Sequence, residues 1–176
     1  MLKIEHLTKV YGSKKAVDDV SLHIQKGEIF GFIGHNGAGK TTTLKACCGI
    51  LECEEGEIYV DGVPLSQMPM QAYRKYLSVV PQNSILFSGS IRENITYGLT
   101  HYSEEELEKA VQDACIDEFL STLPNGLDSP VGERGEKLSG GQKQRISIAR
   151  ALIRNPSILI CQCQLSRLCR LSLKVM

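Results

Sequence analysis

The sequence lacks any apolar run of the roughly 18 residues that a membrane-spanning helix needs, and it has no excess charge of either sign. Its 20 Lys and Arg residues balance 20 Asp and Glu residues, so electrostatics give no reason to expect bulk binding to nucleic acid or to an anionic membrane. Met1 leads directly into a strand-like segment rather than into the apolar core of a signal peptide. With 42% hydrophobic residues in 176, the chain is expected to be one soluble cytoplasmic domain that buries roughly 70% of its unfolded surface.

Disulfide and zinc frameworks are not indicated either, although the chain has seven cysteines. Four of them show no CxxC pairing and lie in apolar-periodic segments, where a free thiol behaves as a small buried hydrophobe. The other three crowd into the end of the chain, well after Glu136, which is the last acidic residue. We therefore expect Cys47, Cys48, Cys53 and Cys115 to be core residues, and Cys161, Cys163 and Cys169 to mark a change in composition.

Apolar runs bounded by turn residues predict strands, with helical periodicity between them. In one of the helices, Ser103 and Glu106 form a capping box ahead of an apolar face. Strands mixed with helices in this order predict an α/β fold with a helical insertion at about residues 83–150. The strands are expected at about 2–7, 17–24, 28–33, 58–60, 77–80 and 157–160, and the helix faces at Leu44, Cys47, Cys48 and Leu51, at Leu107, Ala110, Val111 and Ala114, and at Ile146, Ala149, Arg150 and Ile153.

The clearest motif runs from Gly34 to Thr41 and matches GxxxxGK[ST], between an apolar strand and an amphipathic helix. Glycines lack a Cβ, so the backbone can curl until successive N–H groups point inward, and the N-terminus of the helix adds positive potential. Lys40 would neutralise phosphate charge, and Thr41 would offer a hydroxyl to Mg²⁺. The residues predicted to contact the nucleotide are Gly34, His35, Asn36, Gly37, Ala38, Gly39, Lys40, Thr41 and Thr42.

A second phosphate-binding helix start is predicted at Leu138-Ser139-Gly140-Gly141-Gln142, directly before a helix at 143–153. Small residues leave N–H groups free there, and Ser139 is both a hydroxyl donor and an N-cap candidate. Two such helix starts in one domain suit a site that a second copy completes. Taken alone, the segment is also explained by an ordinary capped helix. The residues predicted to contact nucleotide here are Ser139, Gly140, Gly141 and Gln142.

In these two motifs and their order, the chain resembles the nucleotide-binding domain of ATP-binding cassette (ABC) transporters over residues 1 to about 160. The resemblance implies a P-loop NTPase core with an antiparallel β part and a helical signature subdomain. It implies that Tyr11 stacks on adenine and that Gln82 senses Mg²⁺ and the attacking water while coupling to the membrane domain. It also implies that Lys40 and Gln82 serve catalysis, with ATP and Mg²⁺ as the bound cofactors and Thr41 and Gln82 near the metal.

The resemblance further implies partners. Two such domains would bind ATP head-to-tail, between the phosphate loop of one and the signature of the other. Closure would then drive a membrane-spanning subunit that exports a substrate. The segment Val131–Gly135 resembles the exporter-type contact segment. The domain is therefore expected to be cytoplasmic and peripheral on the inner face of the membrane, with no nucleic-acid partner.

The chain departs from the family pattern after Ile160. The family has one more apolar residue there, then an Asp that holds Mg²⁺ through water and a Glu that polarises the attacking water. Cys161, Gln162 and Cys163 stand at these positions. Gln162 brings no negative charge, and Cys163 is a poor general base. The switch histidine and final strands are also missing from the sequence, so we expect a domain truncated in its final core strand, with nucleotide-binding residues intact.

Residues 161–176 are interpreted as a tail foreign to the family. Read one base later, suitable codons for Cys161 to Cys169 encode Ala-Ser-Ala-Ser-Ser-Leu-Asp-Tyr-Ala, which is similar to the family's Ala-Thr-Ser-Ala-Leu-Asp. A frameshift near codon 160 is the main hypothesis, and a cysteine-rich regulatory tail or metal clip is the alternative.

Two parts of the chain resemble different branches of the family. Up to about Gly62 the sequence resembles free-standing ATPase subunits of two-component exporters. From about residue 63 onward it resembles exporters whose ATPase is fused behind the membrane domain. A crossover or misassembly is one hypothesis for this change. Two other functions stay open: a non-transport ABC ATPase that acts on nucleic acid or ribosomes, and a hydrolysis-deficient fragment that only binds nucleotide.

Overall fold

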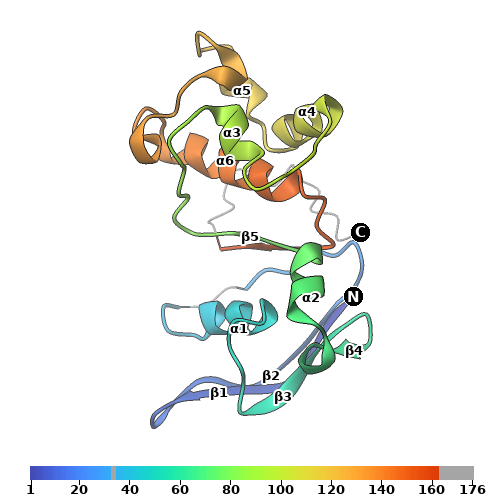
Figure 1. Ribbon diagram of the computed structural model, residues 1–176. Helices are drawn as coiled ribbons and strands as arrows, with labels where there is room; N and C mark the ends of the chain where they lie inside the picture. Colours follow the sequence, from blue (N-terminus) through green and yellow to red (C-terminus); the bar gives the residue numbers. More distant parts are fainter. Residues whose placement is uncertain (33–34, 163–176) are drawn as a thin grey trace. The chain divides into compact units, whose positions relative to one another are not determined.

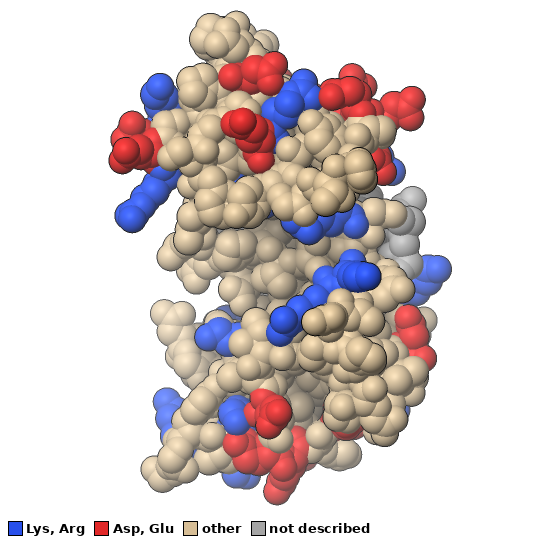
Figure 2. All heavy atoms as spheres, in the orientation of Figure 1, with Lys and Arg blue, Asp and Glu red and all other residues tan. Residues whose placement is uncertain are grey.

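The computed structural model of the protein describes residues 1–32 and 35–162, which fall into two compact units, Met1–Leu77 and 78–162 (Figure 1). Gly34 of the phosphate motif lies outside the described residues, as do Cys163, Cys169 and the rest of the predicted tail after Gln162. Within the described part, no helix is long and apolar enough to cross a membrane. Acidic and basic side chains both occur on the visible face of each unit, as the balanced composition predicts (Figure 2).

The first unit is built on a four-stranded antiparallel sheet with the order β2-β1-β3-β4. Its core face carries Ile4 and Leu7 of β1, each 1% exposed. They are three residues apart because a β-bulge, with His6 at a left-handed φ of 51°, interrupts the strand between them. Ile4 lies opposite Leu22 on one side and Ile58 on the other, so the apolar face is continuous across the strands. The strands are β1 (Leu2–Tyr11), β2 (Lys14–Ile24), β3 (Glu55–Val60) and β4 (Val63–Pro64).

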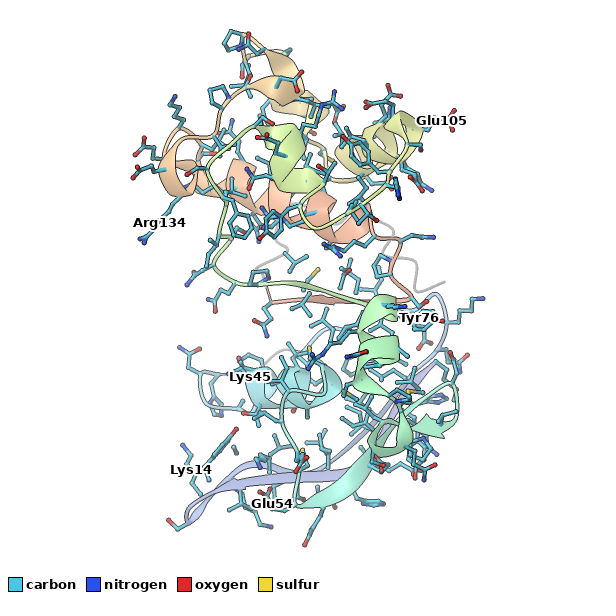
Figure 3. The ribbon with its side chains drawn as sticks, viewed as in Figure 1. Lys14, Lys45, Glu54, Tyr76, Glu105 and Arg134 are labelled. Carbon is cyan, nitrogen blue, oxygen red and sulfur yellow. The ribbon has the colours of Figure 1, made fainter. Side chains whose placement is uncertain are left out.

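Three helices complete this unit: α1 (Lys40–Cys47), the 3-10 helix η1 (Leu65–Gln67) and α2 (Met70–Tyr76), with Lys45 and Tyr76 labelled in Figure 3. The predicted helical face extended to Leu51, but α1 ends at Cys47, and Gly49 follows with a left-handed φ of 64°. The Tyr73 hydroxyl donates to the Cys47 carbonyl oxygen at 2.6 Å and so joins α2 to α1.

The prediction of core cysteines is confirmed for two of the four. Cys47 and Cys48 are 2% and 4% exposed, and burial raises the pKa of the Cys47 thiol to about 12. Cys53 and Cys115 are only half-buried, because each lies in a connection beyond the end of a helix rather than on its apolar face. Cys47, Cys48, Cys53 and Cys115 are free thiols.

The predicted strand at 28–33 is wrong over its described residues, 28–32. Ile29 and Phe30 are 61% and 48% exposed, and the two sheets of the described chain, β2-β1-β3-β4 and β5-β6, do not include this segment. A strand needs a neighbour, because its N–H and C=O groups must pair with another chain segment. An apolar run therefore predicts the tendency to form a strand but cannot supply the partner.

The second unit is mainly helical. Its longest helix, α6, packs against α3 and α4, and the core includes Ile91, Ile95, Leu107 and Ile146, each fully buried. The predicted faces of α4 and α6 are confirmed in this core, except that Arg150 is only partly buried. The elements are β5 (Leu77–Val80), α3 (Ile91–Ile95), α4 (Glu104–Asp113), α5 (Asp117–Leu120), η2 (Gly126–Asp128), η3 (Glu133–Gly135), α6 (Gly140–Leu152) and β6 (Ile158–Cys161), and β5 pairs with β6 in a two-stranded sheet.

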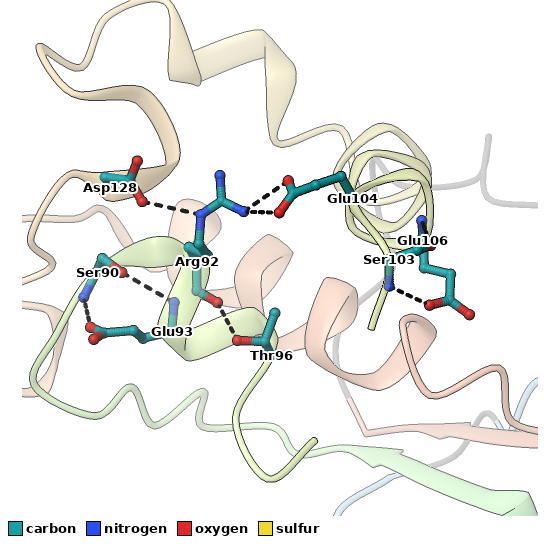
Figure 4. Close-up of polar contacts among 8 residues, drawn as sticks. All are labelled: Ser90, Arg92, Glu93, Thr96, Ser103, Glu104, Glu106 and Asp128. Atoms are coloured by element: carbon teal, nitrogen blue, oxygen red, sulfur yellow. Dashed lines mark hydrogen bonds and ion pairs between the residues drawn. The ribbon is translucent and has the colours of Figure 1, made fainter. Parts of the chain in front are cut away.

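The predicted capping box of α4 is confirmed (Figure 4). The Glu106 N–H donates to the Ser103 hydroxyl at 3.1 Å, and the Ser103 N–H donates to the Glu106 carboxylate at 2.8 Å. The same close-up shows Arg92 of α3 between Glu104 and Asp128, which it contacts at 2.9 and 3.1 Å. This ion-pair cluster ties three separate elements of the unit together.

Candidate nucleotide-binding site

The described part of the phosphate motif, His35–Thr41, has the backbone conformation that the glycines predict. Gly37 and Gly39 have left-handed φ values of 87° and 78°, and the Ala38 N–H donates to the His35 carbonyl oxygen at 3.2 Å. Gly39 then serves as the N-cap of α1. The first N–H groups of a helix have no partner within the helix, and the helix dipole makes this end positive. The loop therefore leads directly into an anion-attracting helix start.

Lys40 folds back over this loop. Its Nζ donates to the His35 carbonyl oxygen at 2.8 Å, so the ammonium lies against the backbone that would surround a phosphate. The Thr43 hydroxyl donates to the Gly39 carbonyl oxygen at 3.1 Å and closes the first turn of the helix. Thr41 is exposed and Thr42 is half-buried, so the Thr41 hydroxyl can be reached from solvent.

The position of Gly39 is determined by close packing on the sheet. A Cβ added there would overlap with the carbonyl oxygen of Ala16 and would lie 3.2 Å from Cγ2 of Val17. By contrast, a Cβ added to Gly37 would meet nothing within 4 Å. The start of α1 thus rests on strand β2, while the tip of the loop is open.

Tyr11 and the phosphate loop belong to the same compact unit. Tyr11 ends β1, lies opposite Lys14 in the antiparallel ladder and is 51% exposed, which suits a ring that takes a planar ligand from solvent. Gln82 belongs to the second unit, where it follows β5 and is exposed. Whether Thr41 and Gln82 share one metal shell therefore remains a prediction.

The signature segment forms a capping box at the start of α6. The Gln142 N–H donates to the Ser139 hydroxyl at 3.2 Å, and the Ser139 N–H donates to the Gln142 side-chain oxygen at 2.9 Å. The N-cap role predicted for Ser139 is therefore confirmed. Gly140 and Gly141 are exposed, with nothing within 4 Å of an added Cβ, so a ligand can approach their backbone closely.

The segment before the signature is anchored to the same helix. Lys143 of α6 donates from Nζ to the Arg134 carbonyl oxygen at 3.1 Å. Val131 is fully buried, and its N–H donates to the Gly89 carbonyl oxygen at 2.9 Å.

Gln162 is the last residue that the structure describes and lies directly beyond β6. Its N–H donates to the Val80 carbonyl oxygen at 2.9 Å. Gln162 is thus placed beside β5, while Cys163 lies outside the described residues.

Sequence reasoning missed a buried polar network behind the loop that follows Gln82. Asn94 is 1% exposed, and its side-chain oxygen accepts from the Phe87 N–H at 2.9 Å and from Arg150 Nη2 at 2.8 Å. Its side-chain nitrogen donates to the carbonyl oxygens of Phe87 and Ser90 at 2.8 and 2.9 Å. No local pattern signals this network, because Asn94 and Arg150 are 56 residues apart in sequence.

The same network supports an exposed apolar patch, which we define as Ile85, Phe87 and Tyr97. These side chains are 64%, 42% and 52% exposed. The rings of Phe87 and Tyr97 stack with centroids 4.1 Å apart, and the Arg150 guanidinium lies 5.2 Å from the Phe87 centroid. The only sequence signal for this patch is that its three apolar residues do not follow the spacing of a helix face or of a strand face.

Comparison with known proteins places this geometry in a family. The family model "ABC transporter" matches residues 17–161. The chain is 44% identical over 160 residues to the uncharacterized ABC transporter ATP-binding protein YwjA of Bacillus subtilis, covering 90% of this chain and 28% of that protein. It is 41% identical over 150 residues to the ATP-dependent lipid A-core flippase of Desulfotalea psychrophila, covering 85% of this chain and 26% of that protein.

A solved structure agrees with these relatives. The structure of a bacterial Atm1-family ABC exporter with ATP bound matches with a TM-score of 0.84 and 36% identity, over 91% of this chain and 28% of that one. The chain thus spans a little over a quarter of the length of each of these three proteins. The matches cover 85–91% of this chain, so each includes residues both before and after position 63, where the resemblance to the family was predicted to change. The predicted α/β fold is confirmed, and the chain belongs to the ABC transporter family, whose ATPase fold it adopts.

Proposed function

We propose that the chain is the ATP-binding domain of an ABC exporter, and that MgATP binds at His35–Thr42 together with Gly34. The observation that carries the proposal is the loop conformation: two left-handed glycines turn the backbone into the N-terminus of α1, with the Lys40 ammonium folded over the loop. A phosphate would replace the His35 carbonyl oxygen as the partner of Lys40. Tyr11, in the same unit, would stack on the adenine ring.

The donor set suits Mg²⁺, which prefers a few hard oxygen ligands and keeps substrate phosphates and water as the others. The Thr41 hydroxyl, exposed at the start of α1, and the side-chain oxygen of Gln82 are such ligands. When bound with the nucleotide, Mg²⁺ would neutralise charge on the β- and γ-phosphates. Thr41 would orient those phosphates from the helix start, and Gln82 would position the attacking water.

ATP hydrolysis is proposed for family members that carry both carboxylates, whereas this chain is proposed to bind ATP with little turnover. Gln162, held beside β5 by its backbone, carries an amide where a carboxylate would serve Mg²⁺, and Cys163 follows it where a general base is needed. Loss of a positioned base typically lowers the rate by about 10²–10⁴. Lys40 and Gln82 would retain their roles in binding and alignment.

Two partners are proposed. The first is a second nucleotide-binding domain, whose bound ATP would meet the exposed backbone of Gly140 and Gly141 and the Ser139 hydroxyl, which has a proton left to donate. The second is a membrane-spanning exporter subunit, which would hold this domain on the inner face of the membrane. The exposed apolar patch of Ile85, Phe87 and Tyr97, which follows Gln82 in the chain, supports this partner because such patches mark interaction sites. The lack of net charge gives no support for nucleic acid.

The proposal is tested by isothermal titration of the purified chain with MgATP, comparing wild type with Lys40→Ala and Lys45→Ala. Lys45 is the matched control, because it is an exposed lysine in the last turn of the same helix. Removing a charged hydrogen-bonding partner costs about 1.5–3 kcal/mol, so Lys40→Ala should weaken MgATP binding by about 10- to 150-fold, with Lys45→Ala close to wild type.

Thermal melts and phosphate release complete the test. The melting temperature of the wild type should rise with MgATP, because a ligand that binds only the folded state stabilises it. Phosphate release should stay far below the binding-limited rate. If MgATP leaves the melt unchanged, or if the two lysine variants bind equally, the phosphate loop does not hold ATP and the proposed function is wrong.

A further inference from the structure

We propose that Lys9 and Glu54 form a positioning pair that holds the Tyr11 ring ready for adenine. This inference rests on the proposed ATP site and adds two residues that no motif assigns to it. Its basis is a set of contacts at the end of strand β1, where Tyr11 is the last residue.

Lys9 and Tyr11 are two residues apart in β1 and therefore project from the same face of the strand. Lys9 Nζ lies 5.6 Å from the centroid of the Tyr11 ring, which is within the range of a cation–π contact. The Lys9 side chain is only 15% exposed, whereas Tyr11 is 51% exposed. The ammonium thus covers part of the ring, and the rest of the tyrosine faces solvent.

Glu54 lies directly before β3 (Figure 3) and restrains Lys9. Its Oε1 accepts from Lys9 Nζ at 2.8 Å, and its Oε2 accepts from the Val10 N–H at 2.8 Å. Its own backbone N–H donates to the Thr8 carbonyl oxygen at 3.1 Å. One residue therefore contacts three consecutive residues of β1, immediately before Tyr11.

These contacts keep both partners charged. The hydrogen bond from Lys9 lowers the pKa of Glu54, and the same bond raises the pKa of Lys9. A charge-assisted hydrogen bond is shorter and stronger than a neutral one, so the ammonium is held against the ring rather than left to rotate in solvent.

Glu54 is also close in sequence to the helix that carries the proposed phosphate site. Residues 48–53 alone separate it from α1, the helix that begins at the phosphate loop. Glu54 thus joins the end of that helix to the strand that carries Tyr11. A ring oriented before the ligand arrives spares the entropy of ordering it on binding, and this is how the pair would raise affinity for the base.

The test separates the base from the phosphates. MgATP and magnesium tripolyphosphate are titrated into the full chain by calorimetry, with wild type, Lys9→Gln and Glu54→Gln. Loss of an exposed cation–π contact should weaken MgATP about two- to fivefold and leave tripolyphosphate unchanged. Lys9→Arg should restore MgATP affinity, because a guanidinium also binds the face of a ring.

Lys3→Gln is the matched control. It removes a similar lysine–tyrosine contact that starts from the same strand, because Nζ of Lys3 in β1 lies 5.9 Å from the ring centroid of Tyr59 in β3. It should leave the affinity for both ligands at the wild-type value. A loss in Lys3→Gln equal to that in Lys9→Gln would assign the effect to the strand as a whole and overturn the proposal.

Two further results would also overturn it. One is unchanged MgATP affinity in both Lys9→Gln and Glu54→Gln, and the other is an equal loss for MgATP and tripolyphosphate. The Tyr11→Ala variant distinguishes failure of the positioning role from failure of the proposed adenine site. If Tyr11→Ala weakens MgATP but Lys9→Gln does not, only the positioning role is wrong. If neither variant changes MgATP affinity, adenine does not stack on Tyr11.

Discussion

Replacing Gly39 by alanine should damage the phosphate loop much more than replacing Gly37. Both glycines have left-handed φ values, 78° and 87°, where an L-residue costs roughly 1–2 kcal/mol. For Gly37→Ala the cost should stop there, because nothing lies within 4 Å of the new methyl group. For Gly39→Ala the methyl group would overlap with the backbone oxygen of Ala16 in strand β2, which cannot rotate away.

Overpacking of this kind adds about 1–3 kcal/mol, so Gly39→Ala should lower the free energy of unfolding by about 2–5 kcal/mol and Gly37→Ala by about 1–2 kcal/mol. Urea unfolding followed by circular dichroism measures both values on nucleotide-free protein. Calorimetry should also show the larger loss of MgATP affinity for Gly39→Ala, because relief of the overlap moves the first turn of α1. Equal destabilisation by the two variants, or a smaller effect of Gly39→Ala, would refute the packing argument.

Three other predictions concern the second unit and the buried thiols. Asn94→Ala removes four side-chain hydrogen bonds, one of them to a guanidinium, and should lower the free energy of unfolding in urea by about 3 kcal/mol, while the exposed Asn125→Ala should stay within about 0.5 kcal/mol of wild type. Ser139→Ala removes the N-cap of α6 and should cost about 1 kcal/mol in the same assay, against no loss for the exposed Ser121→Ala; equal values would mean that the cap contributes nothing. Burial raises the pKa of Cys47 from its ordinary 9.0 to about 12, so the folded state holds this proton at pH values where the unfolded chain has lost it. Its contribution to stability is complete below pH 9 and declines as the pH rises toward 12, so the urea midpoint should fall between pH 8 and pH 10.5, and less steeply in Cys47→Ala.

The residues that could be interpreted from sequence are those whose function depends on neighbours in the chain. The capping box of Ser103 with Glu106 joins residues three apart, Ser139 caps the helix that it directly precedes, and the glycines of the phosphate loop act through their own φ angles. Such features are complete within one turn of backbone. They are therefore visible in the printed sequence and survive in the structure as predicted.

Residues 28–32 show the opposite case. Their apolar composition favours a strand, and yet Ile29 and Phe30 are exposed and no described sheet includes them. Local preference cannot create the neighbouring strand on which a ladder depends. The same limit applies to Cys53 and Cys115, whose partial exposure depends on where their helices end.

The sequence alone was sufficient to recognise the ABC transporter family, the loop that leads into α1 and the signature before α6, because each is written as a contiguous motif. Only the tertiary structure could bring Glu54 to Lys9, which are 45 residues apart, or Arg150 to Asn94, which are 56 apart. These contacts arise when separate elements pack, and their partners are selected by distance in space rather than by spacing in the chain. Hydrogen bonds and ion pairs act over about 3 Å, so only the folded arrangement determines which side chains come within reach of one another.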